Sequence, residues 1–443
     1  MFNSLVHMHG NCVVERAINS AHQKDRSNIQ DWDEPVCVTH FDVNARDYGS
    51  GIKSHEFNDT PATLQQKVHV LAQLIRQAKH PLAYTGAGIS TAAGIDDYAS
   101  KAKKKSVTAA GRAVIKDWKL ARPTLTHRVL AAMYHNGHLA HWIQQNHDSL
   151  PQKAGYPQHA LNEIHGSLHD PANPIVPYEG HLRDDLYSWM HEWQEKQDLC
   201  LALGTSMSGF NCDSVPERCA DRTNGLVIVN LQQTTYDGQA RLRIYAKTDV
   251  VFRMLAKELN LMDGDLECFE QAENKENKGE SDDDDVFRVP FDAEGYPSTT
   301  ETQVWNLNVG ERVKLTGGPY KNDVGEIVSK NQYGHYRLRF ANSINPTFKV
   351  RRRTFSLWMG SWWIEMATHG RGIVPGGRLP FLNVLREKVE KVEENKEREA
   401  IGLDLGKYQN MLKIGLNVKV VEHKMKADRI DEKVVAAFVR SVG

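Results

Sequence analysis

The sequence predicts an α/β fold built on a parallel sheet, and three observations support this prediction. Short apolar runs alternate with helical stretches from residue 81 to about residue 260. This alternation is typical of parallel strands joined by crossover helices. Glycines and polar residues follow several of the apolar runs. Finally, 40% of the 443 residues are hydrophobic and 25% are charged, which is ordinary globular usage.

The first domain is predicted to span residues 59–260. It begins with a helix, because Thr60 can act as N-cap, Pro61 suits the first helical position and apolar residues then recur at helical spacing. Residues 1–58 show little periodicity and are predicted to form a loosely attached N-terminal arm. Buried strands are predicted at 82–85, 139–143, 199–203 and 226–231, an edge strand at 241–245, and helices at 124–134, 185–193 and 249–259.

The rest of the chain divides where its charge reverses. Acidic residues dominate from 261 to 300, with little apolar content before Val286, so a flexible acidic linker is predicted there. Basic residues dominate from 301 to 380, where glycine-containing turns separate short β-type runs and predict a small antiparallel barrel. Residues 381–443 are predicted to be a charged helical tail that opens with a helix at 384–398. The predicted strands of the barrel are 311–315, 325–329, 336–340 and 347–350.

Composition also restricts where the protein works. No stretch approaches the roughly 18–20 apolar residues that cross a bilayer, and we predict neither a signal peptide nor a membrane partner. The six cysteines are too few and too scattered for a disulfide framework, which favours a reducing compartment. We therefore expect a nuclear or cytoplasmic protein.

A glycine-rich turn follows the first predicted strand. It runs Gly86-Ala87-Gly88-Ile89-Ser90-Thr91, and Gly94-Ile95-Asp96-Asp97-Tyr98 comes close behind. Glycines at a strand-to-helix turn let the backbone approach a pyrophosphate, while the helix N-terminus offers unpaired N–H groups. A tight turn with no ligand explains the Gly-x-Gly pattern equally well, so the motif alone does not decide.

Further polar fragments follow other predicted strands. They are Gln145-Asn146-His147-Asp148, Glu163-Ile164-His165-Gly166, Gly204-Thr205-Ser206 and Val229-Asn230-Leu231-Gln232. An open α/β sheet binds its ligand at the carboxyl ends of its strands. These fragments therefore predict one ligand site at that edge.

Together the fragments resemble the NAD-binding core of the sirtuin (Sir2) family over about residues 49–259. Segments 55–90, 121–127, 182–184, 226–232 and 240–244 are similar to the chromatin-associated class IV branch of that family. The resemblance implies a Rossmann-like NAD-binding domain. It also implies an NAD-dependent protein-lysine deacylase (deacetylase) or a related mono-ADP-ribosyltransferase. In this family the carbonyl oxygen of an acyl-lysine protein substrate attacks the ribose carbon of NAD, nicotinamide leaves, and the acyl group ends on ADP-ribose.

The resemblance also implies roles for individual residues. His165 would be the general base, a task that suits an imidazole because its ordinary pKa lies near working pH. Asn146 and Asp148 would line the nicotinamide pocket. The implied cofactor-binding residues are Gly86, Ala87, Gly88, Ser90, Thr91, Asp97, Tyr98, Gln145, Gly204, Thr205, Ser206, Asn230, Gln232 and Thr248.

The chain departs from the family pattern at several points. Ala99 stands where the family has an arginine that helps to order the cofactor loop, and Pro151 stands where a histidine is usual. These departures support an alternative, a catalytically impaired pseudo-sirtuin. Such a protein would bind NAD or ADP-ribose, or only keep the fold, as a component of a larger assembly.

A further departure concerns metal. No cysteine lies between His165 and Leu182, where family members commonly insert a four-cysteine zinc module. We therefore predict that the zinc lobe is missing and that the chain has no metal site. Cys212 and Cys219 are interpreted as buried core thiols.

Residues 309–328 resemble the KOW and other SH3-like barrels found in transcription and translation proteins. Basic and aromatic residues around this pattern predict a surface that binds nucleic acid, docks a protein or has no ligand, and these three alternatives stay open. The residues concerned are Arg337, Arg339, Lys349, Arg351, Arg352, Arg353, Tyr333, Tyr336 and Phe340.

Overall fold

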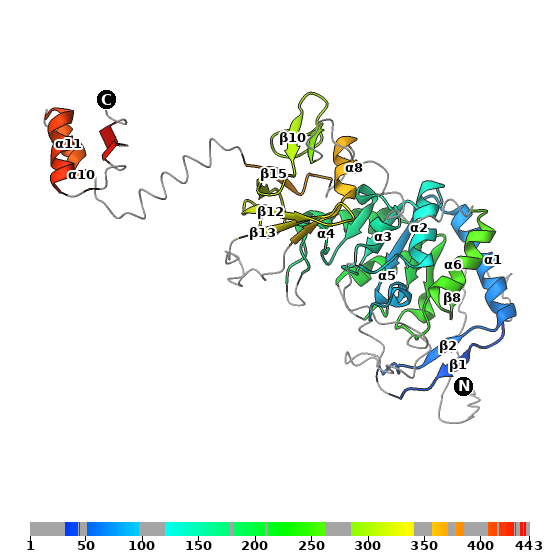
Figure 1. The fold of residues 1–443 in the computed structure, drawn as a ribbon. Helices are drawn as coiled ribbons and strands as arrows, with labels where there is room; N and C mark the ends of the chain where they lie inside the picture. The colour runs from blue at the N-terminus through cyan, green and yellow to red at the C-terminus, as the bar shows by residue number, and fades with distance from the viewer. Residues whose placement is uncertain are drawn as a thin grey trace. The chain divides into compact units, whose positions relative to one another are not determined.

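The computed structural model forms two compact units, residues 1–383 and 384–443, which we describe separately (Figure 1). The structure describes residues 32–42, 44, 51–96, 120–176, 180–208, 211–261, 285–340, 357–370, 377–384, 406–413, 416–428, 430, 435–436 and 438–439. The glycine turn and the polar fragments of the predicted site fall within these ranges. Asp97, Tyr98, Ala99 and the predicted strand at 347–350 lie outside them.

A six-stranded sheet forms the centre of the first unit, and its strands run parallel in the order β5-β4-β3-β6-β7-β8. This confirms the predicted Rossmann-like parallel sheet. Its short strand β5 was not predicted, because two of its three residues are polar and show no apolar run. The strands are β3 (Pro81–Thr85), β4 (His141–Gln144), β5 (Leu161–Glu163), β6 (Leu199–Leu203), β7 (Gly225–Val229) and β8 (Leu242–Ile244).

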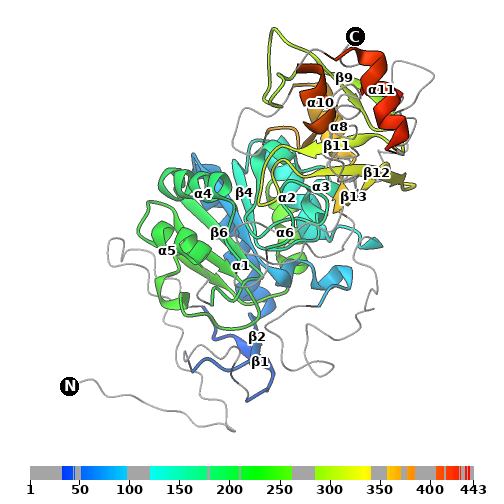
Figure 2. The ribbon, with the colours of Figure 1, turned by 90° about the vertical axis from the view of Figure 1, so that its left-hand side faces the viewer.

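Helices cover both faces of this sheet. Helices α1 (Pro61–Gln77), α2 (Leu125–His135) and α6 (Thr248–Glu258) share one apolar core with the sheet. Helices α4 (Asp184–Lys196) and α5 (Ser214–Ala220) lie side by side and share the other (Figure 2). As predicted, α1 begins after Thr60, whose hydroxyl accepts the Thr63 N–H at 3.3 Å.

Short helical turns occupy the connections. They are α3 (Leu150–Lys153) and the 3₁₀ turns η2 (Ala87–Ile89), η3 (Thr91–Ala93), η6 (Gln158–Ala160), η7 (Asn211–Asp213) and η8 (Asp237–Gln239). Turns η2 and η3 stand where the glycine motif was expected to open a helix. Gly94, with a φ of +86°, ends η3.

An antiparallel hairpin, β1 (Val36–Thr39) and β2 (Glu56–Asn58), lies in the predicted N-terminal arm. It is attached to the parallel sheet, because the Phe57 N–H donates to the carbonyl oxygen of Leu231 at 2.9 Å. The rings of Phe57 and Tyr245 also meet edge to face.

A second sheet follows the acidic segment, and we call residues 285–340, 357–370 and 377–383 the β-module. Its five antiparallel strands are ordered β14-β13-β12-β11-β15. The hairpin of β9 (Val286–Val289) and β10 (Gln303–Asn306) and the helix α8 (Trp362–Thr368) pack on the same core. The sheet consists of β11 (Arg312–Leu315), β12 (Val324–Lys330), β13 (Tyr336–Phe340), β14 (Leu357–Met359) and β15 (Phe381–Asn383).

Strand β9 lies inside the segment 261–300 for which we predicted a flexible linker. Phe287 and Val289 alternate with exposed positions and are buried, because β10 pairs with this strand. Residues 262–284 are outside the described ranges. The described part of the predicted linker, residues 261 and 285–300, thus contains the strand β9.

The β-module contacts the parallel-sheet domain within the first unit, and we call this contact the junction. The Trp362 indole N–H donates to Gln158 Oε1 at 3.0 Å, and the Gly360 N–H donates to the carbonyl oxygen of His169 at 3.0 Å. The ring of His169 lies 4.8 Å from that of His335 and 5.5 Å from that of Trp362. The segment after His165 thus packs against the β-module.

The second unit contains α10 (Gly406–Lys413) and α11 (Val418–Ala427) around a small core that includes Tyr408, Val421 and Met425. Except for Val384, the helix predicted at 384–398 lies outside the described residues. Within the part of the chain that the structure describes, none of the helices combines the length and apolar character that a membrane crossing requires.

Candidate functional site

The glycine turn after β3 packs directly against the loop after β6. The Gly88 N–H donates to the carbonyl oxygen of Gly204 at 2.8 Å, and the Gly86 N–H donates to that of Leu203 at 3.1 Å. A Cβ at Gly88 would lie 2.7 Å from the Cα of Gly204. The close packing of the two loops therefore requires glycine at position 88, whether or not a phosphate binds there.

Asn146, Ser90 and Asp148 form a hydrogen-bonded chain beside this turn. Asn146 Nδ2 donates to the carbonyl oxygen of Gly86 and to Ser90 Oγ, each at 3.0 Å. Ser90 Oγ donates to Asp148 Oδ2 at 2.6 Å, and the Leu150 N–H donates to Asp148 Oδ1 at 3.0 Å. Asp148 is buried, so its carboxylate fixes Ser90, and through it Asn146, rather than facing solvent.

His165 follows β5 and has a defined tautomer. Its Nδ1 lies 3.2 Å from the carbonyl oxygen of Gln145, which can only accept, so Nδ1 carries the hydrogen and Nε2 the lone pair. Burial, and then the charge of His147, lower the pKa of His165 to about 4, against the effect of the Gln145 bond. The imidazole is therefore neutral near pH 7 and can accept a proton at Nε2.

A buried polar cluster supports His165, and the sequence analysis missed it. Cys212 Sγ lies 3.4 Å from His165 Nε2, and burial raises the pKa of Cys212 to about 12, so its S–H donates to this nitrogen. Tyr84 donates to Cys212 Sγ at 3.1 Å and to Asp213 Oδ1 at 2.7 Å, and it accepts from Gln145 Nε2. Cys212 is a buried thiol, as interpreted, but it also contacts His165. A tyrosine within an apolar strand was the only signal in the sequence.

The remaining predicted residues fall into two groups. Thr205 joins the cluster by donating to Gln145 Oε1 at 3.0 Å, and Thr91 Oγ1 donates to the carbonyl oxygen of Gly88 at 3.0 Å. The second group lies at the same edge of the sheet and comprises Ala87, Ser206, Asn230, Gln232 and Thr248. Asp97 and Tyr98 lie outside the described residues.

Arg243 orders the loop after β7. Its guanidinium donates to the carbonyl oxygens of Asn230 at 2.9 Å and Gln232 at 2.6 Å, and it pairs with Asp237 at 2.9 Å. The side chain is only 4% exposed. Arg243 therefore holds the main chain of two predicted cofactor-binding residues, a role that the sequence analysis did not assign.

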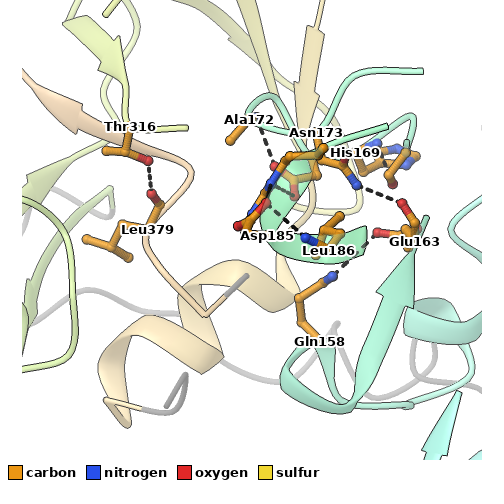
Figure 3. Close-up of polar contacts among 12 residues, drawn as sticks. Gln158, Glu163, His169, Ala172, Asn173, Asp185, Leu186, Thr316 and Leu379 are labelled. Atoms are coloured by element: carbon orange, nitrogen blue, oxygen red, sulfur yellow. Dashed lines mark hydrogen bonds and ion pairs between the residues drawn. The ribbon is translucent and has the colours of Figure 1, made fainter. Parts of the chain in front are cut away.

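A small pocket beside the junction contains Glu163 at the end of β5. Figure 3 shows the side chains of Gln158 and Asn173 pointing toward it. Gln158 Nε2 donates to Glu163 Oε2 at 3.4 Å, and Asn173 Nδ2 donates to the Glu163 carbonyl oxygen at 2.9 Å. Burial, reinforced by Asp170, raises the pKa of Glu163 to about 7, although hydrogen bonds from Gln152 and others oppose this.

We expect Glu163→Gln to stabilise the protein above pH 7. The pKa of this carboxyl is raised in the folded state from an ordinary value of 4.5 to about 7. Its contribution to stability is complete below pH 4.5 and is lost as the pH rises through 7. An amide does not ionise, so the free energy of unfolding of the variant should exceed that of the wild type by roughly 1–3 kcal/mol at pH 8 and match it near pH 4.5.

Urea unfolding at the two pH values measures this difference. Glu192→Gln, at an exposed position of α4, is the control, and because it keeps Glu163 its free energy of unfolding should match that of the wild type at both pH values. Equal stabilities of wild type and Glu163→Gln at pH 8 would contradict the expectation.

The arrangement as a whole offers a neutral base beside half-exposed polar side chains at the carboxyl ends of the strands. His165, Gln145, Asn146 and Ser206 are partly exposed there, while Asp148 beneath them is buried. Such an edge can bind a polar ligand and accept a proton from it.

Known proteins similar to this chain carry sirtuin names, although no protein-family model matches it. The NAD-dependent protein deacetylase sirtuin-7 of Bos taurus is 30% identical over 258 residues, which are 47% of this chain and 64% of that protein. The NAD-dependent protein deacetylase SRT1 of Arabidopsis thaliana is 30% identical over 246 residues, or 46% of this chain and 52% of that protein. The NAD-dependent protein deacetylase Sirt6 of Drosophila melanogaster is 27% identical over 266 residues, which are 49% of this chain and 83% of that protein.

Solved structures also match this chain. The match to a Sir2 complex with a p53 peptide and NAD+ covers 44% of this chain and 98% of the Sir2 chain. The sequence identity is 23% and the TM-score is 0.38. The chain spans less than two thirds of the length of the first two relatives. The named relatives support the sirtuin family for about half of this chain.

Proposed function

We propose that the protein is a sirtuin-like NAD-dependent protein-lysine deacylase that transfers the acyl group to ADP-ribose. The observation that carries the proposal is His165, held as a neutral base by Gln145 and Cys212 beside the chain of Asn146, Ser90 and Asp148. The relatives named above as NAD-dependent deacetylases support it. An acyl-lysine protein is the proposed substrate, and the nucleus or cytoplasm the proposed location.

NAD would supply the ribose carbon that accepts the acyl oxygen. Residues of this chain fit such a ligand, because partly exposed polar groups surround the turn after β3. Asn146 would orient the nicotinamide end, with the buried Asp148 holding it in place through Ser90, and Gln232 and Asn230 would hold the opposite end. His165 would accept a proton from a ribose hydroxyl at Nε2, with the Cys212 thiol giving up its bond to that nitrogen.

Release of nicotinamide tests this function. We expect the full chain to release nicotinamide from NAD only when an acetylated peptide is present, and to form acetyl-ADP-ribose in equal amount. Mass spectrometry of the products identifies the reaction. ADP-ribose attached to the peptide would show a mono-ADP-ribosyltransferase instead. No turnover, with NAD or ADP-ribose still raising Tm, would show the pseudo-sirtuin.

We further propose that the chain lacks the zinc lobe of the family. The segment between His165 and Leu182 is short and cysteine-free. Its main chain folds back on itself, since the Val176 N–H donates to the carbonyl oxygen of His165 at 2.9 Å. The β-module contacts this segment at His169, so it supports the loop from which family members commonly extend their zinc module.

The β-module is proposed to be an SH3-like, KOW-type barrel that binds a protein or a nucleic acid. Arg337 and Arg339 support this, because they alternate with buried residues of β13 and are exposed. Of these two, Arg339 pairs with Glu326 at 3.0 Å. Titrations at two salt concentrations separate the partners, since phosphate contacts weaken steeply with salt.

A further inference from the structure

The N-terminal hairpin brings a cysteine and two histidines together. Cys37 lies on β1, His40 directly follows this strand, and His55 directly precedes β2. A ligand atom of each lies within 4.8 Å of the ligand atoms of the other two. Cys37 Sγ is 3.7 Å from His40 Nδ1. The prediction of no metal site rested on the cysteine-free stretch between His165 and Leu182, far from these residues in the sequence.

An irregular pairing of the two strands produces this cluster. Cys37 pairs with Phe57 and Thr39 with Glu56, so Val38 is an extra residue on β1. Such a bulge redirects neighbouring side chains. Thr39 Oγ1 donates to the buried Glu56 Oε2 at 2.7 Å, which fixes the hairpin at the bulge. The cluster therefore stands on an ordered part of the chain.

The distances suit a tetrahedral zinc ion. With Zn–S near 2.3 Å and Zn–N near 2.0–2.1 Å, neighbouring ligand atoms lie roughly 3.3–3.6 Å apart. The separation of Cys37 Sγ and His40 Nδ1 is already close to this value. His40 is exposed, so its ring can shift by the remaining distance at little cost.

The ring of His55 offers a lone pair at Nδ1, because it accepts a main-chain hydrogen bond there. Its Nδ1 accepts the Phe41 N–H at 3.0 Å, a bond that a metal at this nitrogen would replace.

We propose that Cys37, His40 and His55 bind one zinc ion, with water in the fourth position. One thiolate and two imidazoles are ligands that zinc prefers, and three protein ligands leave its tetrahedral shell open. On binding, the Cys37 S–H bond breaks, its proton passes to solvent and the Zn–S bond forms. The other two bonds use imidazole lone pairs.

The site adjoins the edge of the parallel sheet where we predict cofactor binding. Ser54, next to His55, accepts the Gln232 Nε2–H at its carbonyl oxygen at 3.4 Å. Phe57 bonds to Leu231 in the same loop. The bound ion would hold this stretch of hairpin against that loop. The proposal does not depend on the deacylase function.

Cobalt binding to the full chain tests the proposal. We expect one Co²⁺ per chain, with a thiolate-to-cobalt charge-transfer band and intense visible bands typical of four ligands. In Cys37→Ser the charge-transfer band should disappear. His40→Ala should lower Co²⁺ affinity by more than about 100-fold. Mutating a residue that only hydrogen-bonds to a metal ligand already lowers metal affinity by about 10–100-fold. His69→Ala, an exposed histidine on α1, is the control and should bind as the wild type does.

Elemental analysis of the purified protein should show about one zinc in the wild type and in His69→Ala, and much less in Cys37→Ser. Circular dichroism shows whether the variants fold. If Cys37→Ser does not fold, the Co²⁺ affinity of His40→Ala tests the proposal. Absence of the band in the wild type would overturn the proposal. So would a band that persists in Cys37→Ser, or equal affinities of His40→Ala and His69→Ala.

Discussion

His165→Ala should reduce peptide-dependent nicotinamide release by about 10²–10⁴-fold, the usual contribution of a general base. The imidazole Nε2 is the only part of the proposed mechanism that accepts a proton, and alanine cannot replace it. NAD affinity should stay within a few-fold of the wild type, because Asn146, Asp148 and the glycine turn keep their own hydrogen bonds. Single-turnover kinetics and calorimetric titration with NAD measure the two quantities separately.

The pH dependence of the wild type adds a check on the same residue. Burial lowers the pKa of His165 to about 4, so the base stays unprotonated down to that value. The acid limb of kcat/KM should therefore lie near pH 4 and not near 6.5, as long as the protein remains folded. His147→Ala controls for loosening of the loop, since this half-buried ring lies 6.4 Å from that of His165 and bonds to the carbonyl oxygen of Gly166. Equal losses in the two variants would contradict a chemical role for His165.

Gly204→Ala should destabilise the protein by about 3 kcal/mol or more. Gly204 has a φ of +56°, where a side chain costs roughly 1–2 kcal/mol. Its new Cβ would also lie 2.6 Å from the nitrogen of Ile89 and 2.8 Å from the Cα of Gly88. Both neighbours are main chain, so the two loops must separate, and NAD should no longer raise Tm.

Gly137→Ala is the matched control for this change. Gly137 has a φ of +75° but nothing within 4 Å of its Cβ position, so its substitution lowers the free energy of unfolding only through the backbone conformation. Urea unfolding of both variants isolates the cost of forcing the loops apart. If both substitutions lower the free energy of unfolding equally, Gly88 and Gly204 are not in close contact in solution.

Local patterns predicted the parallel-sheet domain well. Thr60 and Pro61 start α1 as expected, and the apolar run of β6 is found at Leu199–Leu203. Strand β5 escaped prediction because Asn162 and Glu163 are buried polar residues that only tertiary hydrogen bonds stabilise. Sequence patterns are informative where the neighbours in the chain decide the structure.

Contacts between distant segments could not be predicted in the same way. The polar fragments indicated an edge of the sheet, and the structure brings Asn146, Ser90 and Asp148 together there. The contact of Cys212 with His165 joins a connection after β6 to one after β5, and no spacing reveals it. The glycines near β3 were compatible with a phosphate turn or a ligand-free tight turn, and the structure adds a packing reason for Gly88, because Gly204 lies directly beside it.

The junction has a consequence for how the chain is synthesised. Trp362 leaves the ribosome 204 residues after its partner Gln158. The parallel sheet can form first, since its strands end at Ile244, but the loop after His165 then still lacks the partners of Gln158 and His169. Domains generally fold in the order in which they are made. The contacts around the loop that follows His165 therefore form only after the β-module has left the ribosome. Until then the candidate site of the growing chain lacks this support.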